Sequence, residues 1–235
     1  MTRLVLLNNV EHRDVRVITR HSVELGDGVM YTFTFPAEFR NIQAHYPIVF
    51  TRLGEDRIVP VALFGFRENQ NLFIDGDQWD ASYLPMLHDR LPFFVGNGPN
   101  GKVIHLDMDS PRVSRTEGQR LFMEHGGNSE FLEQVTRVMG TIDEGMEAMP
   151  GFIAALQEHN LLESFVLDIQ FRDGTQHRLA GFQAIQEERL AKLDGAALAK
   201  LHERGYLQAI FMVIASLSNF RALIDRAEKL DAADR

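Results

Sequence analysis

Hydrophobic and polar positions follow two different patterns along the chain. Residues 1–125 contain short runs of β-branched, aromatic and aliphatic residues separated by turn residues, which is typical of strands. Met30–Phe35 and Ile48–Leu53 are two of these runs, and Ile58–Phe66 is apolar enough to predict a buried strand. In residues 126–235 the apolar positions recur every three or four residues, which predicts amphipathic helices.

A long helix is predicted at the start of the second half. Ser129 is placed to accept a hydrogen bond at its N-terminus, and apolar residues follow at helical spacing from Phe131 to Ile142. Pro150 lacks the amide hydrogen that a helix interior uses. It therefore either ends this helix or lies in the first turn of the next. Phe152–Leu162 is predicted as that second amphipathic helix.

The C-terminal segment predicts three further helices. Asp194 is expected to cap a segment that continues through Leu201, and Gly205 is expected to break it. Tyr206–Leu217 is apolar on most sides, which predicts a helix inside the core. Phe220–Leu230 is more polar and is expected to continue as a more exposed helix.

Two segments predict hairpins. Phe165–Phe171 alternates from Leu167 onward and is followed by Asp173-Gly174, a strong turn dipeptide, before Gln176–Ile185 returns. The glycine-rich loop Gly96–Gly101 connects two short apolar runs and is a second hairpin-like connection.

These elements together predict an α+β fold. We expect a mixed or antiparallel sheet, formed by the N-terminal half with the 165–185 hairpin and covered by the C-terminal helices. Residues 1–235 are expected to form a single domain, with a β-rich part at 1–125 and a mainly helical part at 126–235.

Composition excludes several kinds of site. The chain has 235 residues and no cysteine, which excludes disulfides, thiolate zinc sites, iron–sulfur clusters and a cysteine nucleophile. Its formal net charge of −9 argues against nucleic-acid binding, which needs a basic face. The longest apolar stretch, Leu207–Leu217, is shorter than a membrane-spanning helix. We therefore expect a soluble, cytoplasmic protein without membrane insertion.

The densest group of aromatic and charged residues suggests a ligand site. It contains the one tryptophan of the chain, and its members are Trp79, Tyr83, His88 and Arg90. Two aromatic rings can enclose an apolar ligand while histidine and arginine bind a carboxylate or phosphate. Tyr46 is added to this candidate set. The alternative is a partly buried loop in which the aromatic residues make local hydrogen bonds, and both interpretations stay open.

A metal site is the specific catalytic hypothesis. His105 and Asp107 share one face of a predicted strand, and His177 would complete a two-histidine, one-carboxylate iron set. Arg178 could then bind a 2-oxo acid. This arrangement needs a jelly-roll core, and the helical second half argues against it. No Gly-x-Ser-x-Gly motif occurs, so a serine hydrolase of that type has no support. No cofactor is predicted, and the Walker and dinucleotide-binding motifs do not occur.

Motifs distributed along almost the whole chain resemble the SapC-like bacterial family in their order and spacing. They are Leu7-Asn8 with His12 and Arg16, Ala37-Glu38-Phe39, Tyr46-Pro47-Ile48-Val49-Phe50, Ala62-Leu63-Phe64-Gly65, Asn71-Leu72-Phe73, Trp79, Tyr83, Pro85, Arg90, Pro92-Phe93, Gly118, Leu121-Phe122, Leu161-Leu162, Gly181-Phe182 and Ser216-Leu217-Ser218-Asn219.

The resemblance implies a bacterial protein whose family is named for a surface-layer and serum-resistance association. Family genes lie beside genes for flavin-dependent halogenase-like proteins, cupin-like proteins and TonB-dependent receptors. This implies an accessory role in uptake or metabolism of a peptide or glycan-derived compound, with a small molecule or a flavoprotein as partner. It implies no catalytic residue. A metal-dependent oxygenase and a structural component of a surface-layer pathway stay open as alternatives, as does a homo-oligomer.

Overall fold

The computed structural model describes residues 3–54, 57–99, 101–171 and 174–233. By the contacts between its residues the chain divides into two compact units. Unit 1 comprises residues 1–28, 74–80 and 86–144, and unit 2 comprises residues 29–73, 81–85 and 145–235. Each unit is therefore assembled from three separate stretches of the sequence. Helices and antiparallel sheets both contribute, so the fold is α+β as predicted.

The largest sheet of unit 1 has three strands. Its order is β1 (Leu4–Leu6), β9 (Gly101–Asp107) and β8 (Phe93–Gly98). The predicted glycine-rich hairpin is confirmed, because β8 pairs with β9 from Phe93 opposite Leu106 to Gly98 opposite Gly101. Its strands extend further into the loop than expected, and Asn100 lies outside the described residues.

The remaining elements of unit 1 are short. Turn residues separate them, so each strand pairs over two residues before the chain changes direction. They are β2 (Arg16–Val17), β10 (Val113–Ser114), β11 (Gln119–Arg120), β6 (Ile74–Asp75), β7 (Gln78–Trp79), the 3₁₀ helix η1 (Val23–Leu25) and the helix α2 (Met86–Asp89).

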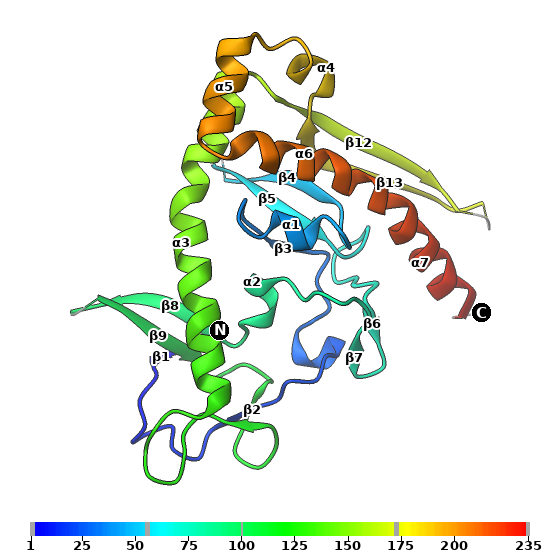
Figure 1. The fold of residues 1–235 in the computed structure, drawn as a ribbon. Helices are drawn as coiled ribbons and strands as arrows, with labels where there is room; N and C mark the ends of the chain where they lie inside the picture. The colour runs from blue at the N-terminus through cyan, green and yellow to red at the C-terminus, as the bar shows by residue number, and fades with distance from the viewer. Residues whose placement is uncertain (1–2, 55–56, 100, 172–173, 234–235) are drawn as a thin grey trace. The chain divides into compact units, whose positions relative to one another are not determined.

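Unit 2 contains an antiparallel sheet of five strands. Their order is β12 (Leu162–Gln170), β13 (Gln176–Ile185), β4 (Ile48–Leu53), β5 (Arg57–Leu63) and β3 (Tyr31–Phe33). The predicted late hairpin is confirmed as β12 and β13, and it joins strands from the N-terminal half (Figure 1). Asp173, in its predicted turn, lies outside the described residues. The apolar run of β5 is buried from Ile58 onward, as its composition predicted.

One long helix, α3 (Glu130–Glu158), contributes residues to both units (Figure 1). Ser129 caps it as predicted, since its Oγ accepts a hydrogen bond of 3.1 Å from the amide of Leu132. The expected break at Pro150 is wrong, because the proline lies inside the helix. Just beyond it, Phe152 is fully buried against Phe39 and Phe50, and this packing offsets the hydrogen bond that the proline removes.

The other helices of unit 2 are mostly in its C-terminal stretch. They are α1 (Phe39–Ile42), α4 (Glu187–Leu190), α5 (Gly195–Glu203), α6 (Tyr206–Ser216), the 3₁₀ turn η2 (Leu217–Asn219) and α7 (Phe220–Ala233). The predicted cap at Asp194 and the break at Gly205 are confirmed: Asp194 accepts a bond of 2.8 Å from the amide of Ala197, and Gly205 has a φ of 73°.

The helix α6 is less buried than its composition suggested. Ile210 and Val213 are fully buried, but Phe211 is 55% exposed, so only one face of the helix belongs to the core. The elements α6, η2 and α7 follow one another without a break, and 25 of their residues, Tyr206–Leu230, form a stretch that by length and composition alone could cross a membrane. The expectation that no apolar stretch approaches that length is therefore wrong, because the turn at Leu217–Asn219 does not interrupt the helix. Core helices of soluble proteins meet the same criterion.

Candidate functional site

A buried aspartate lies at the centre of a polar cluster in unit 1. Asp27 follows η1, whose last turn ends at Gly26 with a φ of 91°, a conformation that glycine adopts without strain. The reversal returns the chain to Ser22, whose amide donates a hydrogen bond of 2.8 Å to Oδ2 of Asp27. The side chain of Asp27 is completely buried as a result.

Two cationic or polar side chains from distant parts of unit 1 meet this carboxylate. Nη2 of Arg112 donates to both oxygens of Asp27, at 2.5 and 2.6 Å, and Nε2 of His88 donates to Oδ1 at 2.7 Å. Nη1 of Arg112 also donates to the backbone oxygens of Ile18 and Arg20. Arg112 and His88 are each 4% exposed, so the network connects three segments of unit 1 inside its core.

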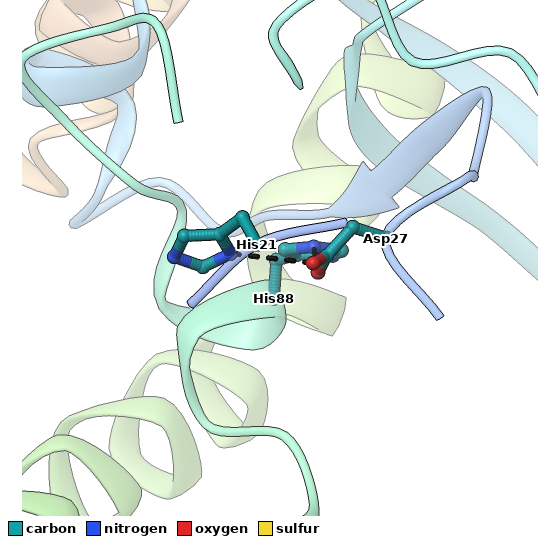
Figure 2. A group of neighbouring side chains, drawn as sticks. All are labelled: His21, Asp27 and His88. Carbon is teal, nitrogen blue, oxygen red and sulfur yellow. Dashed lines mark hydrogen bonds and ion pairs between the residues drawn. The ribbon is translucent and has the colours of Figure 1, made fainter. Parts of the chain in front are cut away.

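A second histidine and the tryptophan complete the cluster. Nδ1 of His21 lies 3.4 Å from Oδ2 of Asp27, and its side chain is 17% exposed. Figure 2 shows both histidine rings directed toward the Asp27 carboxylate. The ring of Trp79 lies beside both, with centroid distances of 5.6 Å to His21 and 5.1 Å to His88. Of the two histidines, His21 is therefore the one that solvent reaches more easily.

The surroundings of Asp27 fix its charge. Burial by itself raises the pKa of this carboxyl, but the neighbouring His21 and His88 and the positive charge of Arg112 lower it by more. The net result is a pKa well below the usual range of an aspartate. Asp27 is thus ionised at any physiological pH and forms a buried ion pair with Arg112.

By residue type, the cluster could be a metal site. His21, Asp27 and His88 offer two imidazoles and one carboxylate, and their ligand atoms lie within 4.8 Å of one another. However, both oxygens of Asp27 already accept hydrogen bonds from Arg112, and a metal ion there would lie beside a guanidinium cation. The arrangement therefore favours an ion-pair network over a metal centre.

A cavity of about 400 Å³ adjoins this network within unit 1. Arg112 and Gly26, the neighbour of Asp27, are part of its lining, so the network holds one wall in place. The apolar part of the remaining lining is Leu25, Leu91, Pro92, Phe94 and Pro111, and the polar part is Asp107, Asp109 and Ser110. Its size is within the range of small-molecule sites.

Comparison with known families assigns the chain. The family model described as SapC matches residues 7–223 of the 235 residues. The chain belongs to the SapC family. The match includes every residue of the buried cluster and of the adjoining cavity. No curated protein and no solved structure matches the chain.

Three of the residues predicted from this SapC-family sequence lie in unit 1. Trp79 and His88 are brought together in the Asp27 cluster. The guanidinium carbon of Arg90 lies 4.3 Å from the ring centroid of Phe94, and Arg90 also donates a hydrogen bond to the backbone oxygen of Phe93. Because Phe94 lines the cavity, Arg90 supports the cavity wall from outside the ion-pair network.

The two tyrosines of the predicted set lie in unit 2. The hydroxyl of Tyr46 donates to the backbone oxygen of Tyr83, and the hydroxyl of Tyr83 donates to Oε1 of Glu38 at 2.9 Å. Tyr46 is fully buried, with its ring centroid 4.7 Å from that of Phe73. Tyr46 is thus part of the unit 2 core and the half-buried Tyr83 is bonded to it, so the predicted set is divided between two units.

Asp107, His177 and Arg178 of the metal hypothesis already make other polar contacts. His105 and Asp107 lie on β9 in unit 1, where Oδ1 of Asp107 accepts hydrogen bonds from the amides of Arg3 and Asp109. His177 lies on β13 in unit 2, and its Nδ1 accepts a bond of 3.3 Å from Nε of Arg67. Arg178 forms an ion pair of 3.7 Å with Asp168, and both side chains are exposed.

Sequence reasoning missed the centre of the cluster. Asp27 and Arg112 are 85 positions apart, and no local pattern connects them. One signal was available, because Asp27 stands between Gly26 and Gly28, and an acidic residue in such a tight turn is well placed to return toward its own backbone.

Proposed function

We propose that this SapC-family chain is a non-catalytic binding protein that serves as an accessory in the uptake or metabolism of a peptide or glycan-derived compound. The cavity of unit 1 carries the proposal. It offers one apolar wall, with Leu25 and Phe94, and one carboxylate wall, with Asp107 and Asp109. A compound with both an apolar part and amine or hydroxyl groups matches these two walls.

The buried network supports binding in preference to catalysis. Asp27, His88 and Arg112 direct their polar atoms at one another inside the core. Charged groups arranged in this way are suited to holding a cavity wall in a fixed position, because a preformed site loses less conformational entropy when a ligand binds. We expect the network to contribute rigidity to the cavity, and Asp109 and Phe94 to contact the ligand.

The family resemblance supplies the partner and the compartment of this proposal. The chain would act in the bacterial cytoplasm and deliver its ligand to, or receive it from, a flavin-dependent halogenase-like enzyme. Co-purification of the tagged chain with a flavoprotein from its native cytoplasm would support this role. Recovery of the chain at the cell surface, without such a partner, would instead favour a structural component of a surface-layer pathway.

Ligand binding can be tested with two probes that represent the two compound classes. Isothermal titration with glucosamine and with the dipeptide Ala-Phe should detect binding by at least one of them. Asp109→Asn and Phe94→Ala should each weaken that binding, by about tenfold for the lost charged hydrogen bond. Asp168→Asn is the matched control, because Asp168 is exposed on β12 in unit 2. Failure of both probes to bind, or equal weakening by the control, would contradict the proposed site.

The rival function, a metal-dependent oxygenase, has a separate test. The ligand types of His21, Asp27 and His88 favour it, and the bidentate contact of Arg112 opposes it. Metal analysis of protein purified without chelator or affinity histidines should find less than stoichiometric metal. Stoichiometric iron that is lost in His88→Ala, together with stabilisation by 2-oxoglutarate, would favour the oxygenase over the binding protein and make the cluster an active site.

A further inference from the structure

A second cavity, of about 450 Å³, lies in unit 2. The residue that follows α3 forms one side, and α4, α5 and the loop between these two helices form the rest. Its titratable lining residues are His159, Arg189, Lys192, Lys200 and Asp194. The cavity therefore collects three cationic side chains and a histidine around one space, against one carboxylate.

This concentration of positive charge stands out against the rest of the chain. The formal net charge of the whole sequence is −9, with 24 lysines and arginines against 33 acidic residues. Cations that face one another across a cavity repel each other, and a bound anion removes that cost. The carboxylate of Asp194 does not by itself balance the charge of these cations. Its Oδ1 already accepts a hydrogen bond from the amide of Ala197, because Asp194 caps α5.

A hydrogen bond between two lining residues and the anchoring of α4 and α5 in the core hold the walls of this cavity. Nε of Arg189 donates a hydrogen bond of 3.4 Å to the backbone oxygen of His159, which ties α4 to the end of α3. Leu190 and Leu201 are buried and anchor α4 and α5 in the core of unit 2. Lys192 and Lys200 are exposed, so their ammonium groups stay hydrated and can reach a ligand.

We propose that this cavity binds a small molecule through its phosphate or pyrophosphate group. Arginine and lysine are the usual partners of phosphate in proteins, and Arg189 supplies the planar fork that matches two phosphate oxygens. The volume leaves room for an organic part beyond the phosphate. This site is independent of the function proposed for unit 1.

The test uses pyrophosphate as the probe with the full-length chain. Isothermal titration should detect saturable binding that weakens as salt is added, because screening reduces the attraction between exposed charges. The triple variant Arg189→Gln, Lys192→Gln, Lys200→Gln should weaken binding by at least about tenfold. The matched control replaces three exposed cations of unit 2 outside the cavity: Arg204→Gln, Arg221→Gln and Lys229→Gln. Its overall change of charge is identical, and binding should stay within about twofold.

A second experiment distinguishes a soluble phosphate compound from a lipid headgroup. Sedimentation with vesicles of phosphatidylglycerol in phosphatidylcholine tests whether the phosphate belongs to a lipid headgroup. Vesicle binding that is lost in the triple variant supports the same site, with a membrane lipid as its ligand. Binding of pyrophosphate without vesicle binding supports a soluble metabolite. No binding in either arm, equal loss in both triple variants, or citrate binding as tightly as pyrophosphate would overturn the proposal. Circular dichroism of both variants checks that they are folded.

Discussion

Units 1 and 2 of this SapC-family chain both bury polar groups, but they surround them differently. In unit 1 the carboxylate of Asp27 is joined to the guanidinium of Arg112 and to His88, among short strands that pair over a few residues. In unit 2 the sheet has five strands, and aromatic rings such as Phe39, Phe50 and Phe152 pack together in its core. Where regular structure is sparse, a charged network connects segments that a ladder of strands would otherwise join.

The largest expected effect is the loss of the charge at the centre of unit 1. Asp27→Asn preserves the shape of the side chain but leaves the buried guanidinium of Arg112 without its counter-charge. We expect a loss of about 3–5 kcal/mol in the free energy of unfolding, measured by urea denaturation. Asp168→Asn, at an exposed position of unit 2, should change it by less than about 0.5 kcal/mol. A small effect of Asp27→Asn would contradict the role that we assign to the network.

Acid should weaken the same network. The pKa of Asp27 in the folded chain lies well below its value in the unfolded chain, so its contribution is complete above about pH 4. As the pH falls below that value, the unfolded chain takes up a proton that the folded chain excludes, and the free energy of unfolding decreases. Urea midpoints measured from about pH 6 to pH 2.5 should fall more steeply in the wild type than in Asp27→Asn. If the midpoints of the wild type and of Asp27→Asn fall in parallel with pH, the acid sensitivity comes from groups other than Asp27.

Packing along α3 can be probed through two of its glycines, Gly145 in unit 2 and Gly140 in unit 1. A Cβ added at Gly145 would lie 2.2 Å from Cδ2 of the fully buried Phe35, whereas one added at Gly140 meets no heavy atom within 4 Å. Gly145→Ala should therefore destabilise the chain by about 1–3 kcal/mol through overpacking. Gly140→Ala should stabilise it by up to about 1 kcal/mol, as alanine does in helix interiors. Equal effects at the two positions would show that Phe35 moves aside without cost.

A gain of stability is also expected at Pro150 in the same helix. Pro150 is exposed and lies inside α3, where it removes one backbone hydrogen bond. Pro150→Ala should raise the free energy of unfolding by about 1–2 kcal/mol, since the restored helix geometry outweighs the greater freedom of the unfolded chain. A thermal denaturation curve measures this directly. A decrease in melting temperature would mean that the proline is needed at this turn.

Local features of the sequence predicted the regular elements well. Ile48–Leu53 is β4 with the predicted bounds, and the caps at Ser129 and Asp194 act through the side-chain oxygens that the sequence indicated. The break at Pro150 and the burial of the helix Tyr206–Leu217 were predicted wrongly because tertiary packing decided both cases. Buried aromatic residues maintain the helix beyond the proline, and one face of α6 remains exposed.

The candidate site was harder to predict for a physical reason. Trp79 and His88 were identified from their local density of aromatic and charged groups, which a sequence displays directly. His21, Asp27 and Arg112 were not, because an ion pair within the core depends on segments that meet after folding, and formal charge alone does not distinguish a buried arginine from a solvated one. The cavity of unit 1 depends on the same long-range contacts.

The interleaving of the two units also affects how the chain can fold as it is synthesised. Unit 1 is not complete until residue 144 has emerged from the ribosome, and by then the strands β3, β4 and β5 of unit 2 have already been made. Those strands have to wait for β13, which pairs with β4, and for the C-terminal helices that contribute to their core. Their apolar surfaces are thus exposed to chaperones and to aggregation during that interval. No single cut in the gene separates one complete unit from the other.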